Sequence, residues 1–320
     1  MHPDGHLFSG GKFWLCLLAA ALALPWLPLG GAAPLVLRIA TLTLIYMVLA
    51  QGLNVVTGFT GLPDFGYAGF LALGAYTAGF LTLYFRMSIW LVLPLAGLHG
   101  ALWGVLRGVP VLKLSKEYFA VATFAFAELL VLFFGSQTRL LKGSSGLAAI
   151  APPDFMGRFS DRPWPSYYLV LAILLTVIWI VFRLRCSRLG RAWSAIREDE
   201  TAARCVGIDV ARCKLAAFAL SAAIGSLAGA FYARWFGMAY PGMFGFRESL
   251  LILCLVIIGG LGSVAGTLLA TLFLIPLTEI MHLLLPAEWS VARYLIFGLL
   301  LVAVMRWRPA GLLPVGDERG

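Results

Sequence analysis

Charged residues are scarce in this chain. Of its 320 residues, 61% are hydrophobic and only 12% are Asp, Glu, Lys or Arg. A soluble domain carries roughly 25% charged residues, because its surface must face water. The scarcity excludes an ordinary soluble protein and predicts a chain whose solvent is lipid.

Alternation of apolar and polar residues is also missing. A membrane-spanning β-barrel needs such period-two strands, whereas residues 169–182 form one apolar run. A helix needs roughly 20 apolar residues to cross a bilayer, and the chain offers many runs of that kind. We therefore predict an all-α integral membrane protein with a single transmembrane domain over residues 1–320.

Catalytic constellations are absent from the sequence. The five cysteines include no Cys-x-x-Cys pair, and no Gly-x-x-x-x-Gly-Lys-[Ser/Thr] loop is present to hold ATP phosphates. The four histidines are too scattered to assemble a Ser/His/Asp or metal site: His2, His6, His99 and His282. We expect a protein that is not an enzyme and holds no cofactor or metal.

Apolar runs are what the chain has in abundance. They predict about ten spans, near residues 13–29, 35–57, 62–84, 88–106, 118–135, 167–182, 214–234, 248–262, 263–285 and 293–305. The first run follows Lys12 and resembles a signal peptide. Because it continues to Leu29, we expect an uncleaved first helix.

Basic residues indicate the orientation of the spans. The net charge is +9, and residues 183–214 hold eight of the 24 Lys and Arg residues. Because these residues lie between apolar runs, we interpret them as topology signals rather than as a nucleic-acid surface. The positive-inside rule places this loop and both termini in the cytoplasm, and the Pro-rich loop 136–166 outside.

Glycine interrupts the apolar pattern at residues 57–66 and 259–263. Broken helices survive at membrane depth only where protein or a water-filled cavity satisfies their backbone, and paired interruptions point to a transport pathway. The alternative is two tight hairpin turns at the cytoplasmic surface. Both interpretations remain open from the sequence.

Two further patterns concern the apolar segments. Glu128 lies near the middle of its span, so we predict that it faces a partner helix or a pathway, and Arg247 and Glu248 are expected to mark an outer helix start. Small residues recur every four positions and predict a helix-packing face: Ser221, Gly225, Gly229 and Ala233.

The polar loop is rich in helix formers over residues 191–205. Glu200 and Arg204 have favourable i,i+4 spacing, Gly207 suits a left-handed C-terminal cap, and Asp209 suits an N-cap. We expect one short helix on the cytoplasmic face, either a solvated connector or a docking surface. Its expected apolar contacts are Trp193, Ile196 and Val206.

Residues 201–207, Thr-Ala-Ala-Arg-Cys-Val-Gly, resemble the coupling motif of ABC importer permeases, with Thr201 where Glu is frequent. Over nearly its whole length the chain resembles LivM-type permeases of branched-chain amino acid ABC importers. The stretches that carry this resemblance are 52–58, 66–76, 118–128, 190–233 and 258–266.

The resemblance implies a multi-pass protein of the bacterial inner membrane with several partners. These are two ATP-binding subunits, a second LivH-like permease and an external substrate-binding protein. It implies ATPase-coupling residues Arg197, Glu198, Glu200, Ala202, Ala203 and Gly207. Together with the glycine breaks and Glu128, it predicts pathway residues Asp64, Gly66, Tyr67, Glu128, Gly259 and Gly260.

Two departures bear on the cargo. Asp64-Phe-Gly-Tyr67 stands where the family usually has Ser-Leu-Gly-His, and Leu141-Lys-Gly-Ser144 where it often has Thr-Gly-Gly-Ser. The first puts a carboxylate beside a glycine break. The expected cargo is a branched-chain or other amino acid. Urea, short amides and small carboxylates are alternatives, as is a proton-coupled secondary transporter that uses Asp64 or Glu128.

Overall fold

The computed structural model describes residues 11–26, 33–112, 114, 116–155, 158–159 and 164–284, and the positions 298–299, 302, 306 and 311–313. Most of the predicted span at 293–305, and both termini, lie outside these residues. That both termini lie on the cytoplasmic side therefore remains a prediction.

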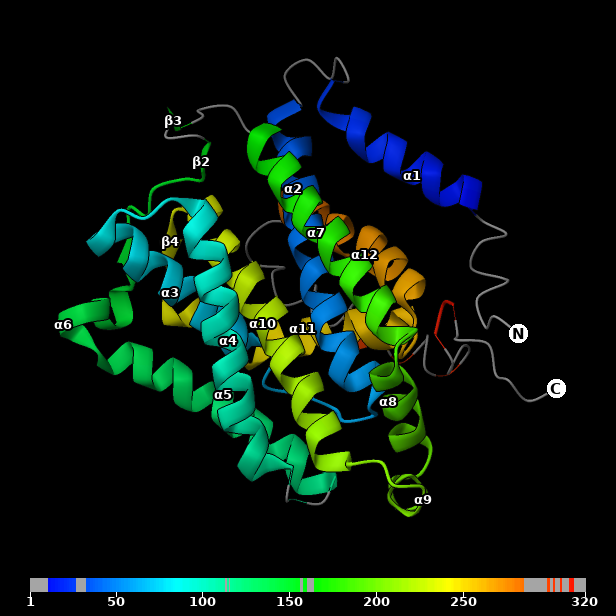
Figure 1. Ribbon diagram of the computed structural model, residues 1–320. Helices are drawn as coiled ribbons and strands as arrows, with labels where there is room; N and C mark the ends of the chain where they lie inside the picture. Colours follow the sequence, from blue (N-terminus) through cyan, green and yellow to red (C-terminus); the bar gives the residue numbers. More distant parts are fainter. Residues whose placement is uncertain are drawn as a thin grey trace.

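The described residues form a helical bundle (Figure 1). The helices are α1 Gly11–Ala23, α2 Ala33–Leu53, α3 Ala68–Phe85, α4 Ile89–Val111, α5 Lys116–Ser136, α6 Thr138–Leu141, α7 Trp164–Arg185, α8 Arg188–Glu198, α9 Glu200–Cys205, α10 Val210–Phe236, α11 Phe246–Gly259 and α12 Val264–Leu284. Short antiparallel pairs join β1 (Leu147–Ala148) to β4 (Met238–Ala239) and β2 (Asp154–Phe155) to β3 (Arg158–Phe159).

Eight helical segments of the described residues are long and apolar enough to cross a membrane. They correspond to eight of the ten predicted spans. In the predicted first span, α1 ends at Ala23 and a 3₁₀ turn, Leu24–Trp26, follows it and contains Pro25; residues 27–29 of that span lie outside the described residues. Proline cannot continue the backbone hydrogen bonding of a helix, which explains this early end.

Helix α10 is the central element and packs against both α3 and α4. Its small residues allow the contact: a side chain added at Gly229 would lie 2.1 Å from the carbonyl oxygen of Leu71. On the other side, a side chain at Gly104 would lie 2.6 Å from Ala222. The small-residue stripe is therefore a packing face, as predicted, since helices in lipid associate through close backbone approach.

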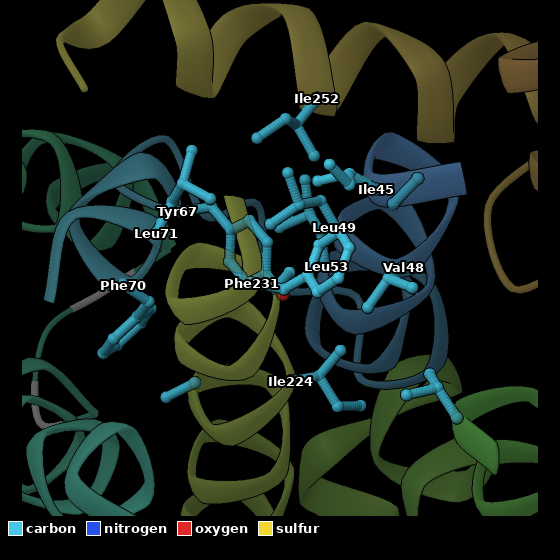
Figure 2. Close-up of a cluster of buried hydrophobic side chains, with 14 of the residues drawn as sticks. Ile45, Val48, Leu49, Leu53, Tyr67, Phe70, Leu71, Ile224, Phe231 and Ile252 are labelled. Carbon is cyan, nitrogen blue, oxygen red and sulfur yellow. The ribbon is translucent and has the colours of Figure 1, made fainter. Parts of the chain in front are cut away.

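The apolar core lies where α2, α3, α10 and α11 meet (Figure 2). Leu49 and Leu53 from α2 point toward Tyr67, which directly precedes α3, and Phe231 from α10, with Ile252 of α11 above them. Helices from the two halves of the chain thus share one apolar contact region.

The loop between α6 and α7 is anchored at the end of the bundle opposite α8 and α9 (Figure 1). The buried guanidinium of Arg234 donates to the carbonyl oxygens of Ala151 and Pro152 at 3.1 and 2.9 Å, and to Asp154 Oδ1 at 2.9 Å. Burial alone raises the pKa of Asp154. Hydrogen bonds from Ser88 and the Ile89 amide, with the charge of Arg234, outweigh burial and hold that pKa below its ordinary value.

Candidate functional site

The first glycine break is a largely buried connection between α2 and α3, π-helical up to Phe59 and without helical structure from there to α3. Helix α2 continues as a π-helical segment, Asn54–Phe59, and α3 begins only at Ala68 instead of near the expected residue 62. Local chemistry explains the late start. Pro63 cannot donate a backbone hydrogen bond, and the Asp64 side chain accepts the Gly66 amide at 2.9 Å.

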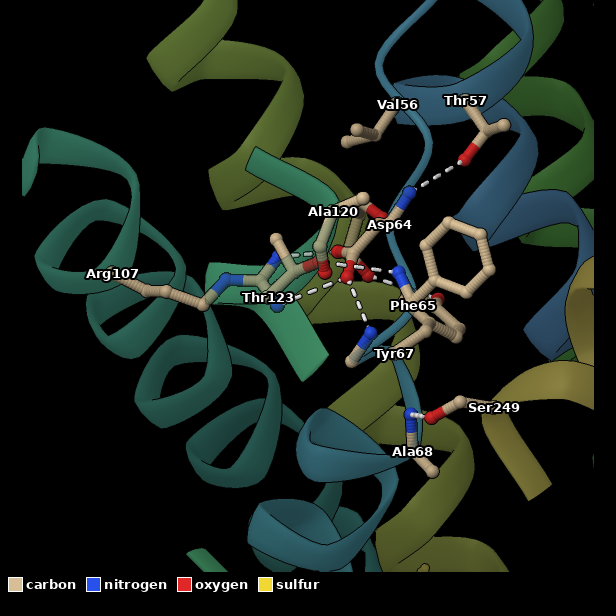
Figure 3. A network of polar contacts seen from close by, with 12 residues as sticks. Val56, Thr57, Asp64, Phe65, Tyr67, Ala68, Arg107, Ala120, Thr123 and Ser249 are labelled. Carbon is tan, nitrogen blue, oxygen red and sulfur yellow. Dashed lines mark hydrogen bonds and ion pairs between the residues drawn. The ribbon is translucent and has the colours of Figure 1, made fainter. Parts of the chain in front are cut away.

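Asp64 forms a buried ion pair with Arg107 of α4 (Figure 3). Its side chain is fully buried and Arg107 is 3% exposed. The guanidinium carbon lies 4.3 Å from the centre of the Phe70 ring, so a cation–π contact adds to the pair. The carboxylate therefore has a fixed positive partner and ties the break to α4.

Arg107 was missed by sequence reasoning, which ended the fourth span at residue 106. The available signal was an arginine within an apolar run, since α4 continues to Val111. A charge inside a membrane-spanning helix requires a partner.

The other predicted residues of this break lie in the same buried network (Figure 3). Tyr67 is fully buried and its hydroxyl donates to the carbonyl oxygen of Ser221 at 3.1 Å. A side chain added at Gly66 would lie 1.8 Å from the carbonyl oxygen of Thr123. The break is thus held between α5 and α10 rather than exposed as a surface hairpin.

The second break is a tight turn from α11 to α12, and it touches the first. Asn54 Oδ1 accepts the Gly262 amide at 2.9 Å. A side chain at Gly58 would lie 2.0 Å from Asn54 Oδ1 and 2.5 Å from the Gly262 nitrogen. The predicted pathway residues Gly259 and Gly260 belong to this turn and are buried. The structure therefore brings together two interruptions that lie about 200 residues apart in the sequence.

Two helix starts contact other helices of the bundle. Glu128, near the middle of α5, accepts the Phe246 amide at 3.1 Å, and the Ala68 amide at the start of α3 donates to Ser249 Oγ at 2.9 Å. Glu128 thus faces a partner helix, as predicted. Glu248 is hydrogen-bonded to Tyr46, which lies near the middle of α2. Residues 247 and 248 therefore mark a helix start, as predicted, and this start contacts α2; that it is an outer start remains a prediction.

Helix α8 lies against both breaks. Arg197 Nη1 donates to the carbonyl oxygen of Gly58 at 2.7 Å and to that of Leu261 at 3.4 Å. The Trp193 ring stacks on Phe59, with centroids 6.4 Å apart and planes 11° apart. The buried face of α8 is therefore built against the glycine breaks themselves.

The predicted single helix over residues 191–205 is two helices. Asp199 is extended, with φ −151° and ψ 112°, and its carboxylate accepts the amides of Thr201 and Ala202 at 2.7 and 3.1 Å. An aspartate that caps the amides following it competes with helix continuation, which explains the division. Asp209 caps α10 in the same way, as predicted.

The end of α9 has the expected cap. Gly207 has φ +85°, a left-handed conformation that favours glycine, and the Ile208 amide donates to the carbonyl oxygen of Ala203. Glu200 pairs with Arg204 at 2.7 Å, as its spacing predicted, and with Lys214 at 2.6 Å. Partial burial raises the pKa of Glu200, but hydrogen bonds from Lys214 and Arg204 outweigh it and lower that pKa.

The predicted coupling residues divide between two faces of residues 188–207, which we call the docking segment. Ala203 is buried, whereas Glu198, Ala202 and Gly207 are exposed. Trp193 and Ile196 are buried as expected, but Val206 is 75% exposed, so its predicted inward contact is wrong. It follows the last turn of α9, where the left-handed cap turns the chain away from the bundle.

Over the described residues, no three His, Cys, Asp or Glu side chains gather as metal ligands would. The site consists of two glycine breaks, a buried ion pair and a docking segment beneath them. The contacts of Arg197 and Trp193 join the docking segment to these breaks.

Comparison with known proteins identifies the family. A family model described as the permease component of the branched-chain amino acid transport system matches residues 35–305. The chain belongs to this permease family. It is 37% identical to the high-affinity branched-chain amino acid transport permease LivM of Salmonella typhimurium, over 98% of this chain and 77% of that protein, and equally to the LivM of Escherichia coli.

More distant relatives include both LivM and LivH permeases. This permease is 24% identical to a probable LivM of Methanocaldococcus jannaschii, over 84% of this chain and 90% of the relative. It is 26% identical to LivH of Salmonella typhimurium, over 85% of this chain and 92% of that protein. No solved structure matches the chain.

Proposed function

We propose that this permease is the membrane-spanning subunit of an ABC importer that moves branched-chain or related amino acids into the cell. The observation that carries the proposal is the docking segment, an exposed pair of short helices packed directly on two glycine breaks. An ATPase that moves this segment would move backbone inside the bundle. The similarity to LivM proteins supports the amino-acid cargo.

The proposed assembly contains this chain as one transmembrane domain, with loop 183–213 in the cytoplasm of a bacterial cell and the chain in its inner membrane. Its proposed partners are two ATP-binding subunits, a LivH-like permease and an external substrate-binding protein. The basic residues of α7, α8 and α9 support this orientation. Similarity to LivH as well as to LivM supports the pairing of two related permeases.

The pathway is proposed to pass by Asp64, Gly66, Tyr67 and Glu128, and the turn that contains Gly259 and Gly260. The starts of α3 and α11, which contact other helices, support it, because irregular backbone within a membrane protein is tolerated beside protein or a cavity. Since Arg107 balances the charge of Asp64, the departure from the family's serine adds no net charge to the break. The departure therefore does not argue against an apolar amino acid as cargo.

The experiment is affinity purification of the tagged chain from its host in mild detergent, followed by reconstitution with whatever is recovered. We expect an ATPase and a second permease to copurify, and ATP-dependent uptake of labelled leucine. Competition by valine, isoleucine, urea and acetamide then defines the cargo class. Uptake by the chain alone, driven by a proton gradient without ATP, would refute the proposal and favour a secondary transporter.

A further inference from the structure

Arg197 differs from its neighbours in the docking segment because its guanidinium turns toward the bundle. It donates to the carbonyl oxygens of Gly58 and Leu261, one in each glycine break. The Gly58 carbonyl lies near the end of the π-helical segment, and the Leu261 carbonyl lies in the turn between α11 and α12. Carbonyls at the last turn of a helix lack intrahelical donors, and a turn carbonyl has none. In contrast, Arg191 donates to Cys186 in the chain just before its own helix, and Arg204 pairs with Glu200.

Arg197 is exposed as a residue, but the stem of its side chain packs against the first break. A side chain added at Gly61, which has φ +71°, would lie 3.2 Å from Arg197 Cγ. One turn away, Trp193 stacks on Phe59 and donates to the carbonyl oxygen of Cys213 at 2.8 Å. Helix α8 is therefore fixed to the first break along its length and not only at one atom.

The two breaks are also joined to each other. The hydrogen bond from the Gly262 amide to Asn54 Oδ1 links the end of α2 to the α11–α12 turn. With Arg197 this makes a closed set of three segments, in which each segment is bonded to the other two. A displacement of α8 that moves one break therefore also strains the hydrogen bonds that hold the other break.

We infer that Arg197 is a positioning residue that transmits displacement of the docking segment to both glycine breaks at once. The inference rests on the proposed function and deepens it, because it assigns to Arg197 an inward role rather than a contact with the ATPase. The planar guanidinium suits this role, since its several donors can serve two carbonyls together. A lysine ammonium at the same place is a point charge on a flexible stem.

The test uses the reconstituted complex with Arg197→Gln, Arg197→Lys and the control Arg139→Gln, an exposed arginine on α6, outside the docking segment. We expect Arg197→Gln to keep its partners and to hydrolyse ATP, while uptake per ATP falls about tenfold, as the loss of a charge-assisted hydrogen bond implies. Arg197→Lys should fall by a smaller factor, and the control should match the parent protein.

Hydrogen exchange supplies a readout that a merely structural role would not move. In the parent complex, a non-hydrolysable ATP analogue should change the protection of residues 54–66 and 257–266 together, and Arg197→Gln should abolish both changes. The inference would be overturned if uptake per ATP were unchanged in Arg197→Gln, or if the nucleotide still changed the hydrogen-exchange protection of both breaks in that variant. If Arg197→Gln does not assemble, the same two measurements on Arg197→Lys decide. Failure of the parent chain to recover any ATPase would count against the proposed function instead.

Discussion

The buried pair of Asp64 and Arg107 allows a quantitative test. Both side chains are almost fully excluded from solvent, at 0% exposure for Asp64 and 1% for Arg107, and the Asp64 carboxylate accepts one further hydrogen bond, from the Gly66 amide. Arg107→Met removes the charge partner and leaves an uncompensated carboxylate in a dry site. Breaking a buried pair from one side costs about 3–5 kcal/mol of unfolding free energy.

The double variant Asp64→Asn/Arg107→Met separates the charge from the packing. Methionine fills much of the space beside Phe70, and asparagine keeps an oxygen to accept the Gly66 amide. Replacing both partners of a buried pair is often nearly neutral. We therefore expect the double variant to be more stable than Arg107→Met alone, with a coupling energy between the two sites of about 1–3 kcal/mol.

The assay is reversible unfolding in mixed detergent and SDS micelles, monitored by tryptophan fluorescence. The parent protein, Asp64→Asn, Arg107→Met and the double variant are measured under the same conditions. Arg191→Met is the matched control, since Arg191 is exposed and lies outside the core. If Arg107→Met changes stability by no more than the control, or if the two substitutions are simply additive, the pair does not fix the break to α4 as reasoned.

Four other predictions follow from particular contacts. Gly58→Ala should separate the two breaks, lower thermal stability and reduce uptake several-fold. Gly97→Ala is the control and should be tolerated, because its added side chain would meet only an atom 3.8 Å away. Equal effects of the two substitutions would contradict the close contact between Gly58 and Gly262. Gly207 has open space around it but a φ of +85°, so Gly207→Val should strain the cap of α9 by about 1–2 kcal/mol and lower the amount of ATPase recovered with the chain. Normal ATPase recovery and normal uptake would show that this cap is not needed for docking. Because the folded-state pKa of Asp154 is lowered, its stabilising effect is present above the ordinary pKa and is lost as pH falls through the lowered value. Thermal stability should therefore drop more in the parent than in Asp154→Asn between about pH 5 and pH 3. Parallel curves of thermal stability against pH for the two proteins would refute this. Glu128→Gln should retain uptake because the amide oxygen can still accept the Phe246 amide, whereas Glu128→Ala should lose it; loss in the Gln variant as well would show that the charge itself is used.

The sequence alone was sufficient for what depends on neighbouring residues. The apolar runs predicted eight of the described spans, and the caps at Gly207 and Asp209 are present as expected. A helix span depends on the transfer of about 20 consecutive residues into lipid, and a cap depends on the backbone within one turn. Such signals can be read from a single sequence, and the family motifs extend over the same local stretches.

Tertiary structure decided what depends on residues far apart in the chain. The partner of Asp64 lies 43 residues away, and the carbonyl that Arg197 reaches in the first break lies 139 residues away. Glycine at positions 58 and 262 indicated interruptions, but no periodicity shows that two interruptions touch or that α8 lies beneath both. Hydropathy describes how each segment meets lipid, whereas the packing of α3, α4 and α10 determines which buried polar groups find one another.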